Sequence, residues 1–153
     1  MTEQQQYANY KHNAFCISGE STTFNIAIAF ISASTVIPTL VTRLTSSPLM
    51  VGLVAGMPNG AWLLPQLFAA RYLADKPLKK PYILVPGGIS RTLILLLAGI
   101  VFATGAKPAR LAISLTLFVI GAFWIGDGLA SLAWFDFLSK SIPPHRRGRL
   151  TGV

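Results

Sequence analysis

The sequence predicts an all-α membrane protein with four transmembrane helices, and two observations support this fold class. Of its 153 residues, 52% are hydrophobic and only 12% are charged, whereas roughly 25% are charged in an average soluble domain. The apolar residues gather into four blocks, each as long as the ~20 residues that an α-helix needs to cross the hydrocarbon core. We therefore expect the lipid bilayer to be the main partner of this chain.

The first block, residues 24–44, predicts a helix that we expect to begin at or after Asn13. Polar residues recur along this segment at intervals that keep them on one helical face. They are Ser18, Ser21, Asn25, Ser32, Thr35, Thr39 and Thr42. Because such a face is unfavourable against lipid, we expect it to point inward. It forms either a wall of a solute path, with Asn25 and Ser32 as candidate residues, or a helix contact in which hydroxyls bond to backbone carbonyls.

The second block, residues 49–73, predicts a helix with glycines at every fourth position. Gly52, Gly56 and Gly60 share one face. Small residues at this spacing allow two membrane helices to pack closely, so we interpret them as a helix contact. Prolines inside the blocks agree with membrane helices, because neighbouring helices satisfy the carbonyls that proline leaves unpaired.

The third and fourth blocks, residues 82–105 and 109–138, each contain one ionisable residue deep in the predicted span. Arg91 lies about 14 Å and Asp127 about 17 Å from the ends of their helices on the 71–81 side, at a rise of ~1.5 Å per residue. A lone charge at this depth costs ~2.5–3.5 kcal/mol. The two residues therefore either form an ion pair or line a cavity in which Asp127 titrates.

Asp127 shares a helical face with aromatic and hydroxyl residues, which would suit an organic solute beside an acid. These candidate cavity residues are Trp124, Ser131 and Trp134. Glu20, in the first helix, is a second candidate acid. Asp136 is expected to pair with Lys140, four residues later on the same helix.

The 13 Lys and Arg residues predict how the chain is oriented. Nine lie on the side that holds both chain ends and the link 74–81, three lie on the other side, and Arg91 lies within a span. Cytoplasmic segments carry the excess of Lys and Arg. We therefore expect links 74–81 and 139–153 and both ends of the chain to be cytoplasmic, in a cell (inner or plasma) membrane. The net charge of +8 does not indicate nucleic-acid binding, because the cations lie in links rather than on one face of a folded domain.

Two of these links resemble signature segments of the major facilitator superfamily (MFS). The loop between the second and third helices reads Asp75-Lys76-Pro77-Leu78-Lys79-Lys80-Pro81. It is similar to the family loop with an acid, a basic residue and a final basic pair, although Arg71 and Leu78 stand where the family has glycines. The segment after the fourth helix, with Pro143, Arg146, Arg147 and Gly148, is similar to the family's link between helices 4 and 5.

The resemblance implies that this chain is the N-terminal part, helices 1–4, of a twelve-helix transporter, with the C-terminal helices absent. It also implies that Asp75, Lys76, Lys79 and Lys80 belong to a conformational latch between the two halves of the transporter. The expected function is transport of a small solute by alternating access, with proton coupling as one alternative.

Two other functions stay open, namely a complete four-helix multidrug-type exporter acting as a dimer and a non-transporting assembly subunit. We do not expect an enzyme, a cofactor or a metal site, because the sequence has no nucleophile motif and no cluster of metal ligands.

Overall fold

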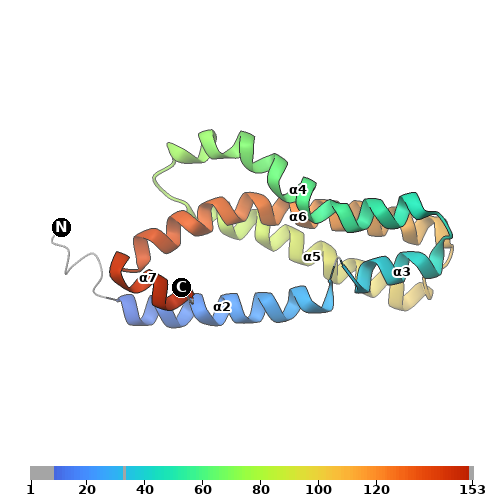
Figure 1. Ribbon diagram of the computed structural model, residues 1–153, viewed down its shortest axis with the longest axis horizontal. Helices are drawn as coiled ribbons and strands as arrows, with labels where there is room; N and C mark the ends of the chain where they lie inside the picture. Colours follow the sequence, from blue (N-terminus) through green and yellow to red (C-terminus); the bar gives the residue numbers. More distant parts are fainter. Residues whose placement is uncertain (1–8, 33, 152–153) are drawn as a thin grey trace.

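The structure is a computed structural model that describes residues 9–32 and 34–151, and every regular element in these ranges is an α-helix. The all-α class is therefore confirmed. The helices are α2 (Tyr10–Phe30), α3 (Val36–Leu44), α4 (Pro48–Ala74), α5 (Lys80–Thr104), α6 (Ala109–Ser141) and α7 (Pro144–Thr151) (Figure 1). Two of them, α5 and α6, are long and apolar enough to cross a membrane.

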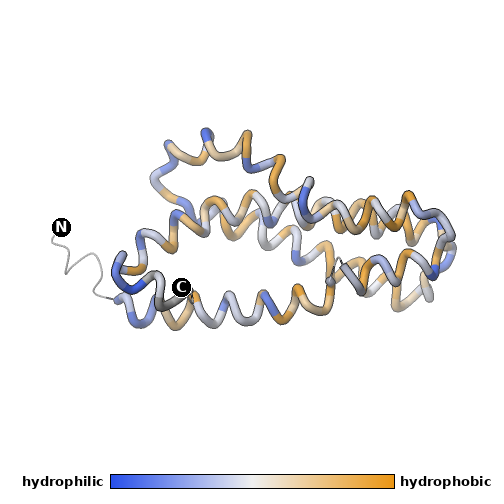
Figure 2. Tube along the Cα trace, viewed as in Figure 1, coloured by the Kyte–Doolittle hydropathy of each residue, from blue (hydrophilic) through white to orange (hydrophobic). Residues whose placement is uncertain are grey.

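The second, third and fourth predicted spans correspond to α4, α5 and α6, and each helix ends within three residues of its expected limits. The start of α2, the α4–α5 link and α7 lie toward one end of the molecule, whereas the α3–α4 and α5–α6 links lie toward the other (Figure 1). This is the alternating course that short links predict. Figure 2 shows hydrophilic positions gathered near α7 and the start of α2.

The prediction of one continuous helix over residues 24–44 is wrong. The helix α2 ends at Phe30, and α3 begins at Val36. Pro38 explains the break, because its ring clashes with the carbonyl group four residues earlier and its nitrogen cannot donate to that carbonyl. In the segment between the helices, Ser32 and Ser34 bond to each other through their hydroxyls (3.0 Å). The polar stripe of the first block is therefore divided between two helices.

The helix α4 contains Pro58 and Pro65 and bends away from α6 in its second half (Figure 1). Each proline removes one hydrogen bond from the helix, which permits a bend at that position. The first half of α4 remains packed on α6. The second half presents exposed leucine and phenylalanine side chains, among them Leu67 and Phe68.

The helix α6 is central to the fold, since it contacts α5 and the first half of α4 extensively and α2 and α3 more locally (Figure 1). The most deeply buried cluster joins α3, α4 and α6 through Ile37, Val41, Val54 and Ile120. A smaller cluster joins the first half of α2 to the end of α6 through Ile17, Leu138 and Ile142. The helix α2 therefore contacts α6 mainly through this cluster, near one end of the molecule.

Candidate functional site

An open groove with a volume of about 1040 Å³ lies between α2, α5 and α6. Its walls are mainly aliphatic and aromatic, and Phe24, Phe123 and Phe137 contribute one ring from α2 and two from α6. Three charged side chains also line it, namely Glu20, Lys80 and Arg91. The groove exists because α2 contacts α6 near one end only, so that the facing surfaces of α2 and α5 remain apart.

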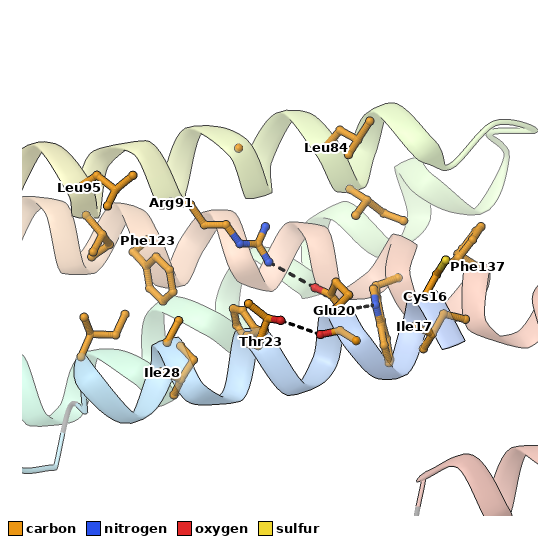
Figure 3. Close-up of a pocket in the computed structure, with 18 of the residues that line it drawn as sticks. Cys16, Ile17, Glu20, Thr23, Ile28, Leu84, Arg91, Leu95, Phe123 and Phe137 are labelled. Atoms are coloured by element: carbon orange, nitrogen blue, oxygen red, sulfur yellow. Dashed lines mark hydrogen bonds and ion pairs between the residues drawn. The ribbon is translucent and has the colours of Figure 1, made fainter. Parts of the chain in front are cut away.

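Glu20 and Arg91 meet across this groove. The Arg91 side chain extends from α5 toward Glu20 on α2 (Figure 3), and Arg91 Nη2 lies 3.5 Å from Glu20 Oε1. The other carboxylate oxygen of Glu20 accepts a hydrogen bond from Trp134 Nε1 at 3.2 Å. The Arg91 guanidinium also lies 5.2 Å from the centre of the Phe24 ring. Both ion-paired side chains are about half exposed, so a solute in the groove would be able to reach them.

Because Gly87 has no side chain, the Arg91 guanidinium can pack against its backbone. Gly87 lies four residues before Arg91, one helical turn away on α5, and a Cβ atom there would be 2.5 Å from Arg91 Nη1. Any larger residue at 87 would force the guanidinium to move. The sequence analysis did not identify this glycine, although a glycine one turn before an arginine deep in a predicted span was a visible signal.

Asp127 occupies a different place, where α4, α5 and α6 approach one another most closely. Its carboxylate accepts a hydrogen bond from Trp62 Nε1 on α4 at 3.1 Å. The flanking glycines make this approach possible. A Cβ on Gly126 would lie 3.0 Å from the Pro86 carbonyl oxygen on α5, and a Cβ on Gly128 would overlap the Trp62 backbone on α4.

The direct ion pair between Arg91 and Asp127, one of the two expected arrangements, is wrong. Among the described residues, the ion pair of Arg91 is with Glu20. The physical reason is that the two side chains extend in different directions. The Arg91 guanidinium passes beside Gly87 and extends toward α2, whereas the Asp127 carboxylate extends toward α4.

The other predicted cavity residues lie outside the lining of the groove. Asn25 Nδ2 donates to the Ser21 carbonyl within α2 (2.8 Å), and Ser32 lies in the break before α3. Trp124 packs against the cluster that joins α3, α4 and α6. Ser131 Oγ donates to the Gly128 carbonyl at 2.8 Å. Of the residues that the sequence analysis named, Glu20, Arg91 and Trp134 line the groove. The residues that it placed on the same helical face as Trp134 do not line it, namely Trp124, Asp127 and Ser131.

No helix of the described residues packs closely at Gly52, Gly56 and Gly60, so the predicted helix contact stays a prediction. An added Cβ at any of the three would meet no atom of the described residues outside its own helical surroundings within 4 Å. The close backbone contact of α4 lies instead at Trp62, which meets Gly128 of α6. Small residues at regular spacing permit close packing, but they do not supply the partner helix.

The loop residues of the first motif stabilise the ends of α4 and α5. Asp75 is the exposed residue that ends α4. Lys79 Nζ donates to the carbonyls of Leu73 and Ala74 at the end of α4. Lys76 Nζ lies 4.5 Å from the centre of the Tyr72 ring. Lys80 begins α5 and reaches the groove.

The second motif contributes α7. Arg146 packs over the Tyr10 ring of α2, with 5.0 Å between the guanidinium carbon and the ring centre. Gly148 lies within α7, and the side chain of Arg147 lies outside the described part of the chain. The predicted pair of Asp136 and Lys140 is confirmed, at 2.8 Å.

Within the described residues, no three His, Cys, Asp or Glu side chains come together in a way that could hold a metal ion. Comparisons of the chain with protein-family models, with curated proteins and with solved structures found no match.

Proposed function

We propose that this chain is the N-terminal part of a major-facilitator-type transporter, which moves a small solute across a membrane by alternating access. The observation that carries the proposal is the half-exposed Glu20–Arg91 pair in a mainly apolar groove of about 1040 Å³. Ionisable groups inside a membrane are expensive, and where they occur they usually line solute or ion pathways. The groove is also large enough for an organic molecule.

The two loop motifs support the same class. Alternating access moves one bundle of helices against another around a central site, and the link 74–81 resembles the segment that latches such bundles in the major facilitator superfamily. In this proposal α2 together with α3, and then α4, α5 and α6, form four spans. Both chain ends and the link 74–81 face the cytoplasm of the cell, and further helices of the same protein complete the site.

Transport is tested with the full-length protein in sealed liposomes, using a panel of labelled organic anions, cations and neutral solutes. We expect at least one solute to equilibrate faster than in protein-free liposomes. Arg91→Gln is expected to slow this flux about tenfold or more, which corresponds to roughly 1.4 kcal/mol of barrier. Arg110→Gln is the matched control, because Arg110 begins α6 away from the groove. Equal rates for the protein, Arg91→Gln and empty liposomes would contradict the proposal.

Topology is tested separately with a Leu78→Cys variant in a Cys16→Ser background, because Cys16 is the one cysteine of the chain. Leu78 is exposed in the link between α4 and α5. A membrane-impermeant thiol reagent is expected to label it in inside-out vesicles but not in intact cells. Labelling from outside intact cells would reverse the proposed orientation.

A further inference from the structure

We infer that the groove between α2, α5 and α6 binds an organic monoanion, with a carboxylate or similar oxyanion at Arg91 and an apolar, aromatic body along the phenylalanine walls. This inference rests on the proposed function and names the class of solute. The first observation is the charge of the lining, since Lys80 and Arg91 face it against the single carboxylate of Glu20. One negative charge in the solute would neutralise the groove.

The second observation is that Arg91 has more unused hydrogen-bonding capacity than Glu20. A guanidinium has five N–H donors in a fork that matches a carboxylate in two places at once. In the described residues, Arg91 meets Glu20 through one contact of 3.5 Å, longer than the ~2.7–2.9 Å of a charge-assisted hydrogen bond. Glu20 already has partners at both oxygens, Arg91 and Trp134. The groove therefore offers donors to a solute rather than acceptors.

The third observation is the aromatic character of the walls. Phe24, Phe123, Trp134 and Phe137 all line the groove. They provide an apolar surface on which the body of an organic solute can lie, beside the fixed charge that orients it. A small inorganic anion would leave this surface empty. The combination selects an amphiphilic anion over a neutral, a cationic or a purely inorganic solute.

Glu20 acts as a competitor in this arrangement. Its carboxylate faces the Arg91 guanidinium in the empty groove, so it repels an incoming carboxylate and competes with it for the N–H donors of Arg91. A site that is only partly available binds its ligand more weakly, in proportion to the fraction that is available. Removing the competing carboxylate should therefore strengthen anion binding, whereas a purely structural ion pair would give weaker binding when either partner is lost.

The test measures binding by isothermal titration to the protein in nanodiscs of phosphatidylcholine, with empty nanodiscs as the blank. The probes are 4-phenylbutanoate, 4-phenylbutan-1-ol and 4-phenylbutylamine, which share one apolar body and differ in charge. We expect the carboxylate to bind about tenfold or more tightly than the alcohol, as the loss of a charged hydrogen-bond partner implies, and the amine to bind least. An amine that binds as tightly as the carboxylate would overturn the inference without any variant.

Two variants sharpen the result. Arg91→Gln is expected to abolish the preference for the carboxylate over the alcohol, and Glu20→Gln is expected to strengthen carboxylate binding about three- to tenfold. Arg110→Gln should change neither. Weaker carboxylate binding in Glu20→Gln, in protein that keeps its helical circular dichroism, would assign the pair a structural role and overturn the inference.

Two further arms separate the alternatives. In nanodiscs that contain phosphatidylglycerol, 4-phenylbutanoate is expected to bind unchanged, whereas its displacement by this anionic lipid would assign the groove to lipid headgroups and overturn the soluble anion. Binding of the carboxylate without flux of any solute would support this inference and contradict the proposed transport. Flux of cations alone would support transport and overturn the inference.

Discussion

Two parts of the molecule are held in place in contrasting ways. One part, called the rigid unit below, consists of α4, α5 and α6, and the other is the helix α2. In the first, backbones approach closely at Gly126 and Gly128, and Val54 and Ile120 are almost completely buried. In α2, Ile17 is the one buried residue. The other contacts of α2 are mostly polar or aromatic, and they include Glu20 to Arg91, Glu20 to Trp134, Phe24 to Arg91 and Tyr10 to Arg146.

This difference indicates which part of the molecule can move. Close-packed interiors resist rearrangement, whereas a helix with few buried contacts lies at the low-stability end of a structure. The groove between α2, α5 and α6 lies along the boundary between the two parts. The ion pair of Glu20 and Arg91 is one of the contacts that join them. A solute that replaces Glu20 at Arg91 would therefore release α2 at the same time.

The largest expected effect comes from Gly128→Ala. The added methyl group would overlap the Trp62 backbone, and neither helix can move away without opening the contact between α4 and α6. Overpacking of this kind costs about 1–3 kcal/mol and more where backbone must shift. We expect a loss of about 3 kcal/mol or more in the free energy of unfolding, measured by titration with denaturing detergent.

Gly56→Ala is the matched control, because it makes the same change on α4 where no atom of a neighbouring element lies within 4 Å in the described residues. Alanine favours the helical state over glycine by roughly 0.5–1 kcal/mol. The control should therefore unfold at the same or a slightly higher detergent concentration. Equal losses in the two variants would mean that α4 and α6 are not in close contact at Gly128.

The next prediction compares the rigid unit with α2 by replacing one buried isoleucine with alanine in each. Ile120 is 1% exposed between α3, α4 and α6, and Ile17 is 7% exposed between α2 and α6. Removing a buried isoleucine side chain costs about 2–5 kcal/mol, less where the surroundings can close the cavity. We expect Ile120→Ala to lose about 3 kcal/mol of unfolding free energy and Ile17→Ala about 1–2 kcal/mol. If Ile17→Ala loses more unfolding free energy than Ile120→Ala, α2 belongs to the rigid unit, and the proposed division is wrong.

Features set by neighbouring residues were predictable from the sequence. The pair of Asp136 and Lys140 follows from helical spacing alone, and it is present. The limits of α4, α5 and α6 follow from the lengths of the apolar blocks and the polar links. The break between α2 and α3 was also within reach, because Pro38 prevents a continuous helix there, but the apolar content of the block outweighed that signal.

Features set by the meeting of distant segments were not predictable in the same way. The partner of Arg91 depends on where α2 lies, and no local pattern distinguishes Glu20 from Asp127 as that partner. Gly52 and Gly56 have the spacing of a helix contact but no neighbouring helix within the described residues, whereas Gly128 makes a close contact without that spacing. Periodicity identifies a face, but the tertiary fold decides what the face meets.

The smallest expected effect tests the link between Trp134 and Glu20. Trp134→Phe keeps an aromatic ring at the end of α6 but removes the Nε1–H donor to Glu20, a bond worth about 1.5–3 kcal/mol if fully formed to a charged group and less where it is exposed. Glu20 is about half exposed, so we expect a loss of about 0.5–1 kcal/mol in the attachment of α2. Global unfolding should hardly change, because α4, α5 and α6 keep their contacts.

The appropriate measurement for that variant is local. Ile17, the buried residue of α2, packs against the end of α6, so the rate of thiol labelling of an Ile17→Cys variant, made in the Cys16→Ser background, reports how often α2 leaves α6. We expect about two- to fivefold faster labelling in Trp134→Phe, as a shift of 0.5–1 kcal/mol implies. Trp124→Phe makes the same chemical change on α6 away from the groove and should leave the rate unchanged. If instead Trp124→Phe accelerates labelling as much as Trp134→Phe, α2 and the rigid unit respond together, and the boundary between them does not run along the groove.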